Sequence, residues 1–260
     1  MKILEWNINQ RSPEKRLKNN ISFLPEIPSF VYSRIMEQKA DIVCLTEYYS
    51  NSEFREKLEN DYWVQESENM SGNQILLAVS KRFAPEPIEC VRKTDEKGCY
   101  NFLHIRFLDN MNRNLSVIGI RMLPPADAEK QTPPFNQYLN KVEEPFVCVG
   151  DFNIRESRMK EWFPNYQTAV LCAQDELEKI SYIFPNDFKN PEKITDLGIL
   201  DHVLLSPCFT ATSSYNWDFL ADDKIYPNRL SLEINKPYPV IPPPLPDHGM
   251  LIAYVNNSGL

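Results

Sequence analysis

Long hydrophobic runs are absent from this sequence, and their absence excludes a transmembrane helix, which needs about 20 consecutive apolar residues. The first residues, Met1 to Glu5, lack the apolar core of a signal peptide and are typical of a strand. We therefore expect a cytoplasmic protein. The composition, with 42% hydrophobic residues over 260 positions, is sufficient for a packed core. Because no domain boundary is visible, we expect one domain over residues 1–260.

Closely paired cysteines and an excess of basic residues are also missing. None of the six cysteines are spaced as Cys-x-x-Cys, which argues against a zinc knuckle, and we expect all six to be reduced. The net charge of −8 argues against tight, non-specific binding of nucleic acid. A nuclease is still possible, because a divalent metal and a local cluster such as Arg11, Lys15, Arg16 and Lys18 can replace a basic surface.

Apolar segments that lead into polar side chains recur along the chain. In the clearest case, four apolar residues at 146–149 are followed by Gly150, Asp151, Phe152 and Asn153. Side chains alternate along a strand, so Asp151 and Asn153 are expected on the same side. A carboxylate beside an amide can hold a water molecule and orient it. This segment therefore predicts a buried strand that carries reactive groups at its carboxyl end.

Four other predicted strands carry polar side chains near one end. They are Asn7 and Asn9 in residues 3–9, Glu47 in residues 41–47, Asp201 in residues 199–206, and Asp247 with His248 just before residues 250–255. Taken alone, most have an ordinary explanation, because Asn and Asp favour turns and a terminal Glu often faces solvent. Asp201 is different, since a buried carboxylate is costly unless it is paired, and a histidine is a natural partner.

Helical and extended segments alternate, which predicts an α/β protein whose ligands bind at the carboxyl ends of strands. Helices are expected at residues 30–39 and 51–59, within 133–144, and from 157 to 162. Strands expected at residues 62–64, 74–79, 100–107 and 115–122 are separated by turns, which indicates antiparallel hairpins and a mixed sheet. Residues 207–246 are expected to be rich in loops, with an extended proline-rich segment at 236–246.

Together and in this order, these motifs resemble the endonuclease/exonuclease/phosphatase superfamily, which has the deoxyribonuclease I-like fold. The matching segments are Trp6-Asn7-Ile8-Asn9, Leu45-Thr46-Glu47, Gly150-Asp151-Phe152-Asn153, residues 200–206, and Asp247-His248. The resemblance extends from residue 3 to residue 255. It implies a four-layer αββα sandwich, in which two packed mixed β-sheets are flanked by helices. It also implies hydrolysis of a phosphate ester with Mg²⁺ or Mn²⁺.

The resemblance implies a metal site formed by three residues. Glu47 would be the principal metal ligand, with Asp247 and Asn9 nearby. Hard oxygen ligands suit Mg²⁺, which takes few carboxylates and usually keeps several waters. Such a metal neutralises the charge that develops on the phosphate and helps to activate the nucleophile.

The same resemblance implies the catalytic residues. Asp151 would orient or deprotonate the attacking water, and Asn7 and Asn153 would position the phosphate or the water. His248 would donate a hydrogen bond to a phosphate oxygen, with Asp201 holding the imidazole and favouring its charged form. General acid–base assistance of this kind contributes roughly 10²–10⁴ in rate.

One position departs from the family pattern. The family commonly places a second histidine at the end of a central strand, where this chain has Arg121. The chain has only three histidines, and neither His104, which we expect to be structural, nor His202 obviously replaces it. An arginine can bind phosphate oxygens through several donors but cannot give up a proton. We interpret Arg121 as a phosphate-binding residue; the alternative is a surface arginine in a less efficient site.

Three functions follow from these observations. The first is a metal-dependent nuclease or phosphodiesterase acting on nucleic acid, supported by the basic run at residues 11–18 and by aromatic residues such as Tyr48, Tyr49, Tyr215 and Trp217 that could stack on bases. The second is a phosphatase or phosphodiesterase acting on a small-molecule or lipid-headgroup phosphate, which the acidic balance favours. The third is a non-catalytic binding protein on the same fold.

Overall fold

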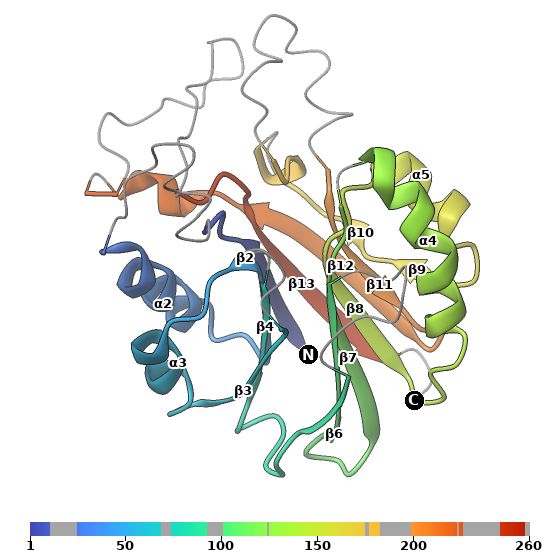
Figure 1. Cartoon of the computed structure of the whole chain (residues 1–260), viewed down its shortest axis with the longest axis horizontal. Coiled ribbons are helices and arrows are strands. Elements are labelled where there is room, and N and C mark those ends of the chain that lie inside the picture. The colour runs from blue at the N-terminus through green and yellow to red at the C-terminus, as the bar shows by residue number, and fades with distance from the viewer. Residues whose placement is uncertain are drawn as a thin grey trace, which may run out of the picture.

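The computed structural model of the chain describes residues 1–10, 25–68, 74–92, 101–123, 125–174, 177–182, 199–222, 224–225 and 245–257. In this part of the chain, the strands form two mixed sheets that pack face to face (Figure 1). Helices cover the outer face of each sheet. The four-layer αββα sandwich predicted from the sequence is therefore confirmed.

The first sheet contains seven of the described strands, with β1 at its centre. Its spatial order is β10 (Val170–Leu171), β12 (Phe209–Asn216), β13 (Met250–Asn257), β1 (Lys2–Asn7), β2 (Ile42–Tyr48), β4 (Gln74–Ser80) and β3 (Tyr62–Glu66). Strands β1 and β2 are parallel, and Asn7 lies beside Thr46 in their register. The carboxyl ends of both strands therefore lie at the same edge of the sheet.

The second sheet contains six of the described strands. Its spatial order is β5 (Glu89–Arg92), β6 (Phe102–Leu108), β7 (Asn114–Arg121), β8 (Phe146–Asp151), β11 (Asp201–Leu205) and β9 (Gln167–Thr168). Strands β7 and β8 are parallel, and Arg121 lies beside Asp151. Strand β11 is antiparallel to β8, and Asp201 also lies beside Asp151. Three charged residues are thus neighbours across three adjacent strands.

In the described part of the chain, helices lie on the outer face of each sheet (Figure 1). The helices are α2 (Ile27–Gln38) and α3 (Ser52–Leu58) on the first sheet, and α4 (Pro125–Leu139) and α5 (Glu156–Trp162) on the second, with the short 3-10 helices η1 (Leu177–Lys179) and η3 (Asp218–Ala221) elsewhere. Helix α2 buries Phe30 and Val31 against the first sheet, and Met159 of α5 packs in the cluster on the second. Amphipathic helices of this kind are stabilised mainly by burial of their apolar face.

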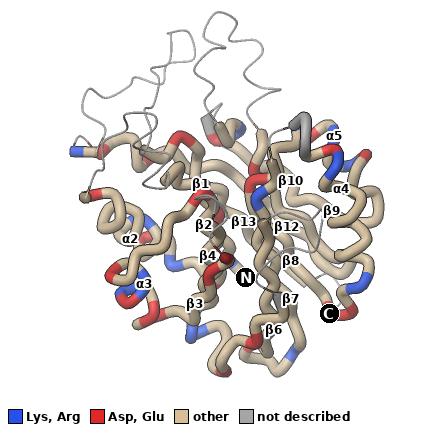
Figure 2. The backbone as a smooth tube through the Cα atoms, viewed as in Figure 1, with Lys and Arg blue, Asp and Glu red and all other residues tan. Residues whose placement is uncertain are grey.

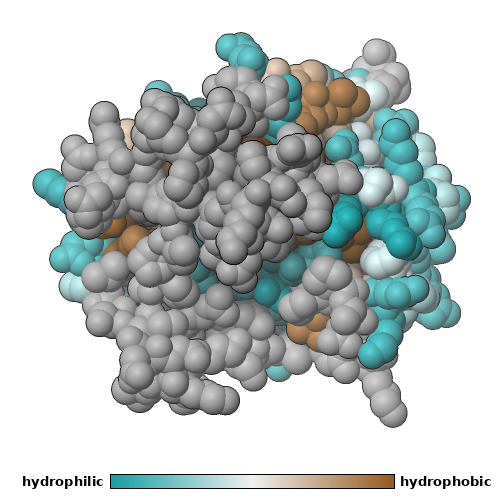
Figure 3. All heavy atoms as spheres, turned by 90° about the horizontal axis from the view of Figure 1, so that it is seen from above, coloured by the Kyte–Doolittle hydropathy of each residue, from teal (hydrophilic) through white to brown (hydrophobic). Residues whose placement is uncertain are grey.

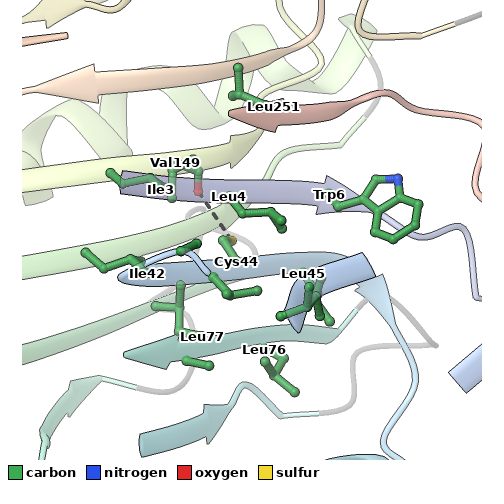
Figure 4. Packing of buried hydrophobic residues seen from close by; sticks show 14 of the residues in the cluster. Ile3, Leu4, Trp6, Ile42, Cys44, Leu45, Leu76, Leu77, Val149 and Leu251 are labelled. Atoms are coloured by element: carbon green, nitrogen blue, oxygen red, sulfur yellow. Dashed lines mark hydrogen bonds between the residues drawn. The ribbon is translucent and has the colours of Figure 1, made fainter. Parts of the chain in front are cut away.

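Side chains on the two faces of β1 contact different layers of the sandwich. Trp6 points toward the helices, with its ring centroid 6.0 Å from that of Phe30. Asn7 lies on the opposite face and reaches Asp151 of the second sheet, so Glu5, two residues earlier, lies on that inner face too. The layer between the sheets is closely packed, and the Cys44 thiol donates a hydrogen bond of 3.6 Å to the Val149 carbonyl across it (Figure 4).

The loop-rich prediction for residues 207–246 is wrong at Phe209–Asn216, because this segment is strand β12 and pairs with β13 along its whole length. Its buried positions alternate as in a half-buried strand. The exposed positions hold Thr, and the buried ones include Ala211 and Ser213, so the apolar signal is weak. The proline-rich segment is mostly outside the described residues, as is the basic run at residues 11–18.

Helix α4 differs from its prediction, because it begins at Pro125 and ends at Leu139 with Pro133 and Pro134 inside it. A proline lacks the backbone N–H of the helical ladder, so the pair argued against a helix through these positions. The short strands β5, β9 and β10 and the 3-10 helices η1 and η3 were not predicted. Apart from α4 and β12, the other helices and strands lie where the sequence predicts them, within a few residues. In the described part of the chain, no helix is long and apolar enough to cross a membrane.

Candidate active site

An aspartate at the carboxyl end of β8 is the centre of a hydrogen-bond network that joins the two sheets. Asp151 Oδ2 accepts from Asn7 Nδ2 at 3.2 Å and from Asn153 Nδ2 at 3.0 Å. Its Oδ1 accepts from the Asn153 backbone N–H at 2.9 Å. The Asn153 amide also donates to the Met122 carbonyl at 2.8 Å. The structure therefore brings the three predicted residues Asn7, Asp151 and Asn153 together.

Three of the predicted residues adopt the left-handed backbone conformation near the carboxyl ends of their strands. The φ angles are 49° at Asn9, 48° at Glu47 and 51° at Asn153. Asparagine tolerates this region well, whereas glutamate rarely adopts it, and such residues cluster at functional sites. Asn7 Oδ1 accepts from the Asn9 backbone N–H at 3.0 Å, and Asn9 Nδ2 donates to the Leu245 carbonyl at 3.1 Å. These contacts fix the turn after β1 and bring the loop before β13 against it.

Arg121 is buried among carboxylates, so the surface-arginine alternative is wrong. Its side chain donates to Glu47 Oε1 at 2.5 Å and to the Met122 carbonyl at 2.8 Å. Its Nε lies 3.6 Å from Asp151 Oδ2 and, within the described residues, has no hydrogen-bond partner. Burial lowers the pKa of the guanidinium, but the charges of Asp151 and Glu47 raise it further, and the net pKa is above its ordinary value. The group is a fixed cation between two acids.

The histidine of the loop before β13 pairs with the aspartate of β11. His248 Nδ1 lies 2.8 Å from Asp201 Oδ2, and both side chains are buried. The His248 backbone carbonyl accepts from the Trp6 indole N–H at 2.9 Å, which fixes the loop. Burial lowers the pKa of His248, but the Asp201 carboxylate raises it more, to about 10. The imidazole is therefore a cation near neutral pH, aligned by a carboxylate.

Asp151 has a pKa suited to a general base. Burial raises it, the neighbouring Arg121 opposes that rise, and the net pKa is about 6 against an ordinary value of 3.8. The charge of Asp201 also raises it. A base works best when its pKa lies near the operating pH, because it is then both ionised and able to take a proton. Perturbed carboxyl groups of this kind are typical of active sites.

The residues expected to hold a metal fit a hard divalent cation. Among the described residues, no three His, Cys, Asp or Glu side chains are grouped as a metal site. Mg²⁺ does not require such a group, because it accepts one or two carboxylates and completes its shell with water. Asn9 Oδ1 is buried and has no hydrogen-bond partner in the described structure. The next residue, Gln10, donates its backbone N–H to the Glu47 carbonyl at 2.9 Å, which links the turn after β1 to Glu47. Asp247 is half-buried on the loop before β13.

The two remaining histidines do not belong to this site. His104 lies between the Tyr138 hydroxyl at 2.6 Å and the Ser116 hydroxyl at 2.8 Å, so its structural interpretation holds. His202 Nε2 lies 2.7 Å from the Ile154 carbonyl, on the opposite face of β11 from Asp201. Neither ring takes the place of the histidine that Arg121 replaces.

Sequence reasoning missed two residues of the site. Glu5 is fully buried beneath it and accepts from the Thr46 hydroxyl at 3.1 Å. Its strand position, two residues before Asn7, was the available signal, because alternation puts both on one face. Tyr182 packs its ring against His248, with centroids 4.6 Å apart. Nothing in the sequence near Tyr182 indicated that contact. Figure 3 looks onto this end of the molecule, where described hydrophilic side chains are visible near the middle and on one flank.

The fold of this chain is also found in proteins of known structure. Two mixed sheets pack with helices outside, and polar residues meet at strand ends. No model of a known protein family matches the chain, and no curated protein matches it in sequence. Solved structures do match over nearly its whole length. The chain has the fold of the endonuclease/exonuclease/phosphatase superfamily, as its motifs predicted.

Three of these structures show the range of the fold. Truncated TDP2 from Caenorhabditis elegans has a TM-score of 0.61 and 14% identity, covering 98% of this chain and 96% of its own. An endonuclease/exonuclease/phosphatase family protein from Bacteroides thetaiotaomicron has a TM-score of 0.60 and 10% identity, covering 98% and 97%. A mannosyl-6-phosphatase from the same species has a TM-score of 0.58 and 8% identity, covering 98% and 99%. At these identities the likeness concerns the fold.

Proposed function

We propose that this protein is a divalent-metal-dependent phosphoesterase, and that it hydrolyses phosphodiester bonds of nucleic acid by in-line attack of water. One observation carries the proposal. The Asn7–Asp151–Asn153 network and the Asp201–His248 pair meet where the two sheets join, with a buried base beside a buried imidazolium. Such a pair of titratable groups in different protonation states supports acid–base chemistry at one bond.

Asp151 is the proposed base. Its carboxylate takes a proton from the attacking water, and the two asparagine amides hold the carboxylate in place. Both amides are donors that favour the ionised form of Asp151. His248 donates to an oxygen of the phosphate, where negative charge increases in the transition state. Asp201 fixes the ring of His248 and stabilises its charge, as a positioning residue.

Glu47, Asn9 and Asp247 would hold the Mg²⁺ or Mn²⁺ ion. When bound, the ion neutralises charge on the phosphate oxygens and lowers the pKa of its bound water. Glu47 already binds Arg121, so the carboxylate would be shared between the guanidinium and the ion. Arg121 keeps its Nε–H without a hydrogen-bond partner among the described residues, and we assign that donor to a phosphate oxygen.

The second candidate substrate is a small phosphate ester. The net charge of −8 favours it, because an acidic protein repels a polyanion more strongly than a single phosphate. A structural neighbour is a mannosyl-6-phosphatase, so the fold accommodates such a substrate in another protein. The chemistry proposed for Asp151 and His248 is the same for both substrates.

A substrate panel tests both the reaction and the substrate class. It contains single- and double-stranded DNA and RNA, an aryl phosphodiester, sugar phosphates and other monoesters, each with Mg²⁺, Mn²⁺ or EDTA. We expect cleavage that needs the metal and is lost in Asp151→Asn, while the matched control Asp61→Asn, at an exposed position, stays active. Cleavage of nucleic acid alone supports the first substrate class, and release of phosphate from monoesters alone supports the second. A folded protein that is inactive on every substrate, or active without Asp151, contradicts the proposal.

A further inference from the structure

A third carboxyl group lies in the layer between the sheets, beneath the proposed site. Glu5 has no exposed surface, and its Oε1 accepts from the Thr46 hydroxyl at 3.1 Å. Its Oε2 is buried and has no hydrogen-bond partner in the described structure. A buried oxygen without a partner is expensive, and native proteins rarely leave one. Glu5 therefore needs an explanation that Thr46 alone does not supply.

Asp201 also has one carboxylate oxygen that is not hydrogen-bonded within the described residues. Its Oδ2 is paired with His248, whereas its Oδ1 is buried and, among the described residues, lacks a partner. Glu5 shares the inner face of β1 with Asn7, which reaches Asp151, and Asp201 lies beside Asp151 in the facing sheet. Asp201 is also the charge that acts most strongly on Glu5. Two buried carboxyl groups with one unsatisfied oxygen each thus face the same enclosed layer.

Two ionised carboxylates cannot satisfy each other, because neither has a donor. A neutral carboxylic acid can, because its O–H donates while the other group accepts, and an apolar enclosure keeps such an acid neutral near pH 7. The titratable groups around Glu5 are Asp201 and Asp151 on the facing sheet, His248 on the loop before β13, the Cys44 thiol on β2 and the Tyr215 hydroxyl on β12. Burial and the two aspartates raise the pKa of Glu5 well above its ordinary value, and the charge of His248 only partly opposes this.

We propose that the Glu5 carboxyl group stays protonated and that its O–H donates a hydrogen bond to Asp201 Oδ1. Glu5 is then a positioning residue for the Asp201–His248 pair. The contact is direct or passes through one enclosed water, which would also satisfy both oxygens. Glu5 then fixes one oxygen of Asp201 and His248 binds the other, so the aspartate has a single orientation. The proposal rests on the function assigned above to Asp201 and His248.

The protonation state is tested without any assay of activity. Infrared spectra of the whole protein with ¹³C-labelled glutamate are compared for wild type and Glu5→Gln at about pH 7.5, where an exposed carboxyl group is ionised and gives no acid band. We expect a carbonyl band of a protonated carboxylic acid in wild type that is absent from Glu5→Gln. If folded wild-type protein has no such band, Glu5 is ionised and the proposal is wrong.

The positioning role is tested with two substitutions of similar size. Glu5→Gln keeps a donor toward Asp201, and we expect its kcat to stay within about threefold of wild type. Glu5→Leu removes the donor, and we expect kcat to fall about 10- to 100-fold, as for other residues that orient a ligating or catalytic group. Equal kcat and pH profiles for Glu5→Leu and wild type would contradict the role, as would a Gln variant as impaired as the Leu variant.

A third measurement separates this inference from the proposed activity. The chain has only three histidines, so the imidazole signals of His248 can be assigned by NMR. We expect them to shift in Glu5→Leu and to stay close to wild type in Glu5→Gln, whether or not a substrate has been found. Thermal unfolding of each variant checks the fold. If Glu5→Leu does not fold, the infrared spectra of wild type and Glu5→Gln still decide whether the Glu5 carboxyl group is protonated. Unchanged His248 signals in folded Glu5→Leu would overturn the inference.

Discussion

At the scale of single residues, each charged side chain of the site contacts a group that stabilises its charge. Asp151, the proposed base, accepts hydrogen bonds from two amides, and the imidazole of His248 is paired with the carboxylate of Asp201. Arg121 lies between Glu47 and Asp151. The protonation state and the position of each charged group therefore depend on its partner, so substituting one residue also alters the group that it contacts.

The pKa of Asp151 predicts how activity depends on pH. Because this pKa is raised to about 6, the carboxylate is protonated at lower pH and cannot accept a proton from water. We therefore expect kcat/KM, measured at saturating metal, to fall about tenfold for each pH unit below about 6 and to be flat just above it. A profile that is half-maximal near 3.8, the ordinary value, would contradict a raised pKa of Asp151.

Arg121 predicts a link between stability and metal. Arg121→Ala leaves Glu47 and Asp151 buried without their guanidinium, which without metal should lower the free energy of unfolding by about 3–5 kcal/mol. A divalent cation at Glu47 replaces part of the lost charge, so Mg²⁺ should raise the melting temperature of the variant more than that of wild type.

The control for this experiment is Arg106→Ala. Arg106 also binds two carboxylates, Glu89 and Glu144, but it is half exposed and pairs with Ser116, near the opposite end of β7 from Arg121. We expect little change in its stability and no extra effect of Mg²⁺. If Arg121→Ala behaves in the same way as this control, the guanidinium does not balance the two buried acids.

At the scale of elements, the close approach of β7 and β8 puts Arg121 beside Asp151. Gly150, next to Asp151, has a φ of +152°, and a Cβ placed there would lie 1.8 Å from the Ile120 carbonyl oxygen. Only glycine allows the two strands to meet at this point. The glycine of the Gly-Asp-Phe-Asn motif is therefore needed to position Asp151, the proposed base.

Two glycine substitutions test this explanation. Gly150→Ala forces apart backbone atoms, so we expect a loss of more than about 4 kcal/mol in the free energy of unfolding. Gly119→Ala is the matched control on β7, where the added Cβ would meet the side-chain ends of Ile75 and Leu77 at 2.9 and 3.0 Å. Side-chain ends can move, so this variant should lose about 1–3 kcal/mol. Urea unfolding measures both, and equal losses would contradict the backbone argument.

The sequence predicted the elements better than the contacts between them. Glu47 and Asp151 follow buried apolar runs near the ends of β2 and β8, whereas Asp201 begins β11 and precedes one. These local patterns survive folding. The ion pair between Arg121 and Glu47 was not predictable, because it joins β7 to β2 across two different sheets. Strand β12 was missed because Thr and Ser fill much of it, and its burial depends on pairing with β13.

At the scale of the whole molecule, the site exists only where the two sheets are packed together. Asn7 belongs to the first sheet and Asp151 to the second, and His248 precedes β13 of the first while Asp201 belongs to β11 of the second. Both hydrogen bonds therefore cross the interior. A change that separates the sheets would disturb the proposed base and the proposed imidazolium together.

The overall charge predicts how a nucleic-acid substrate would respond to salt. Figure 2 shows Lys and Arg interspersed with Asp and Glu along the described chain, and the net charge is −8. Proteins that contact 6–10 phosphates through basic side chains lose roughly 10³–10⁵ in affinity between about 50 and 200 mM salt. Recognition here would rest on a metal, Arg121 and His248 instead.

We therefore expect kcat/KM for a DNA or RNA substrate to fall by less than about tenfold over that range of salt, because few counterions are released and repulsion from the acidic surface is screened. The measurement is the slope of log kcat/KM against log salt at fixed Mg²⁺, with a small aryl phosphodiester, which carries one negative charge, as the reference. A steep negative slope for nucleic acid alone would mean that several basic side chains contact the strand. Parallel, shallow slopes for both substrates would mean that recognition is confined to the phosphate at the reacting centre.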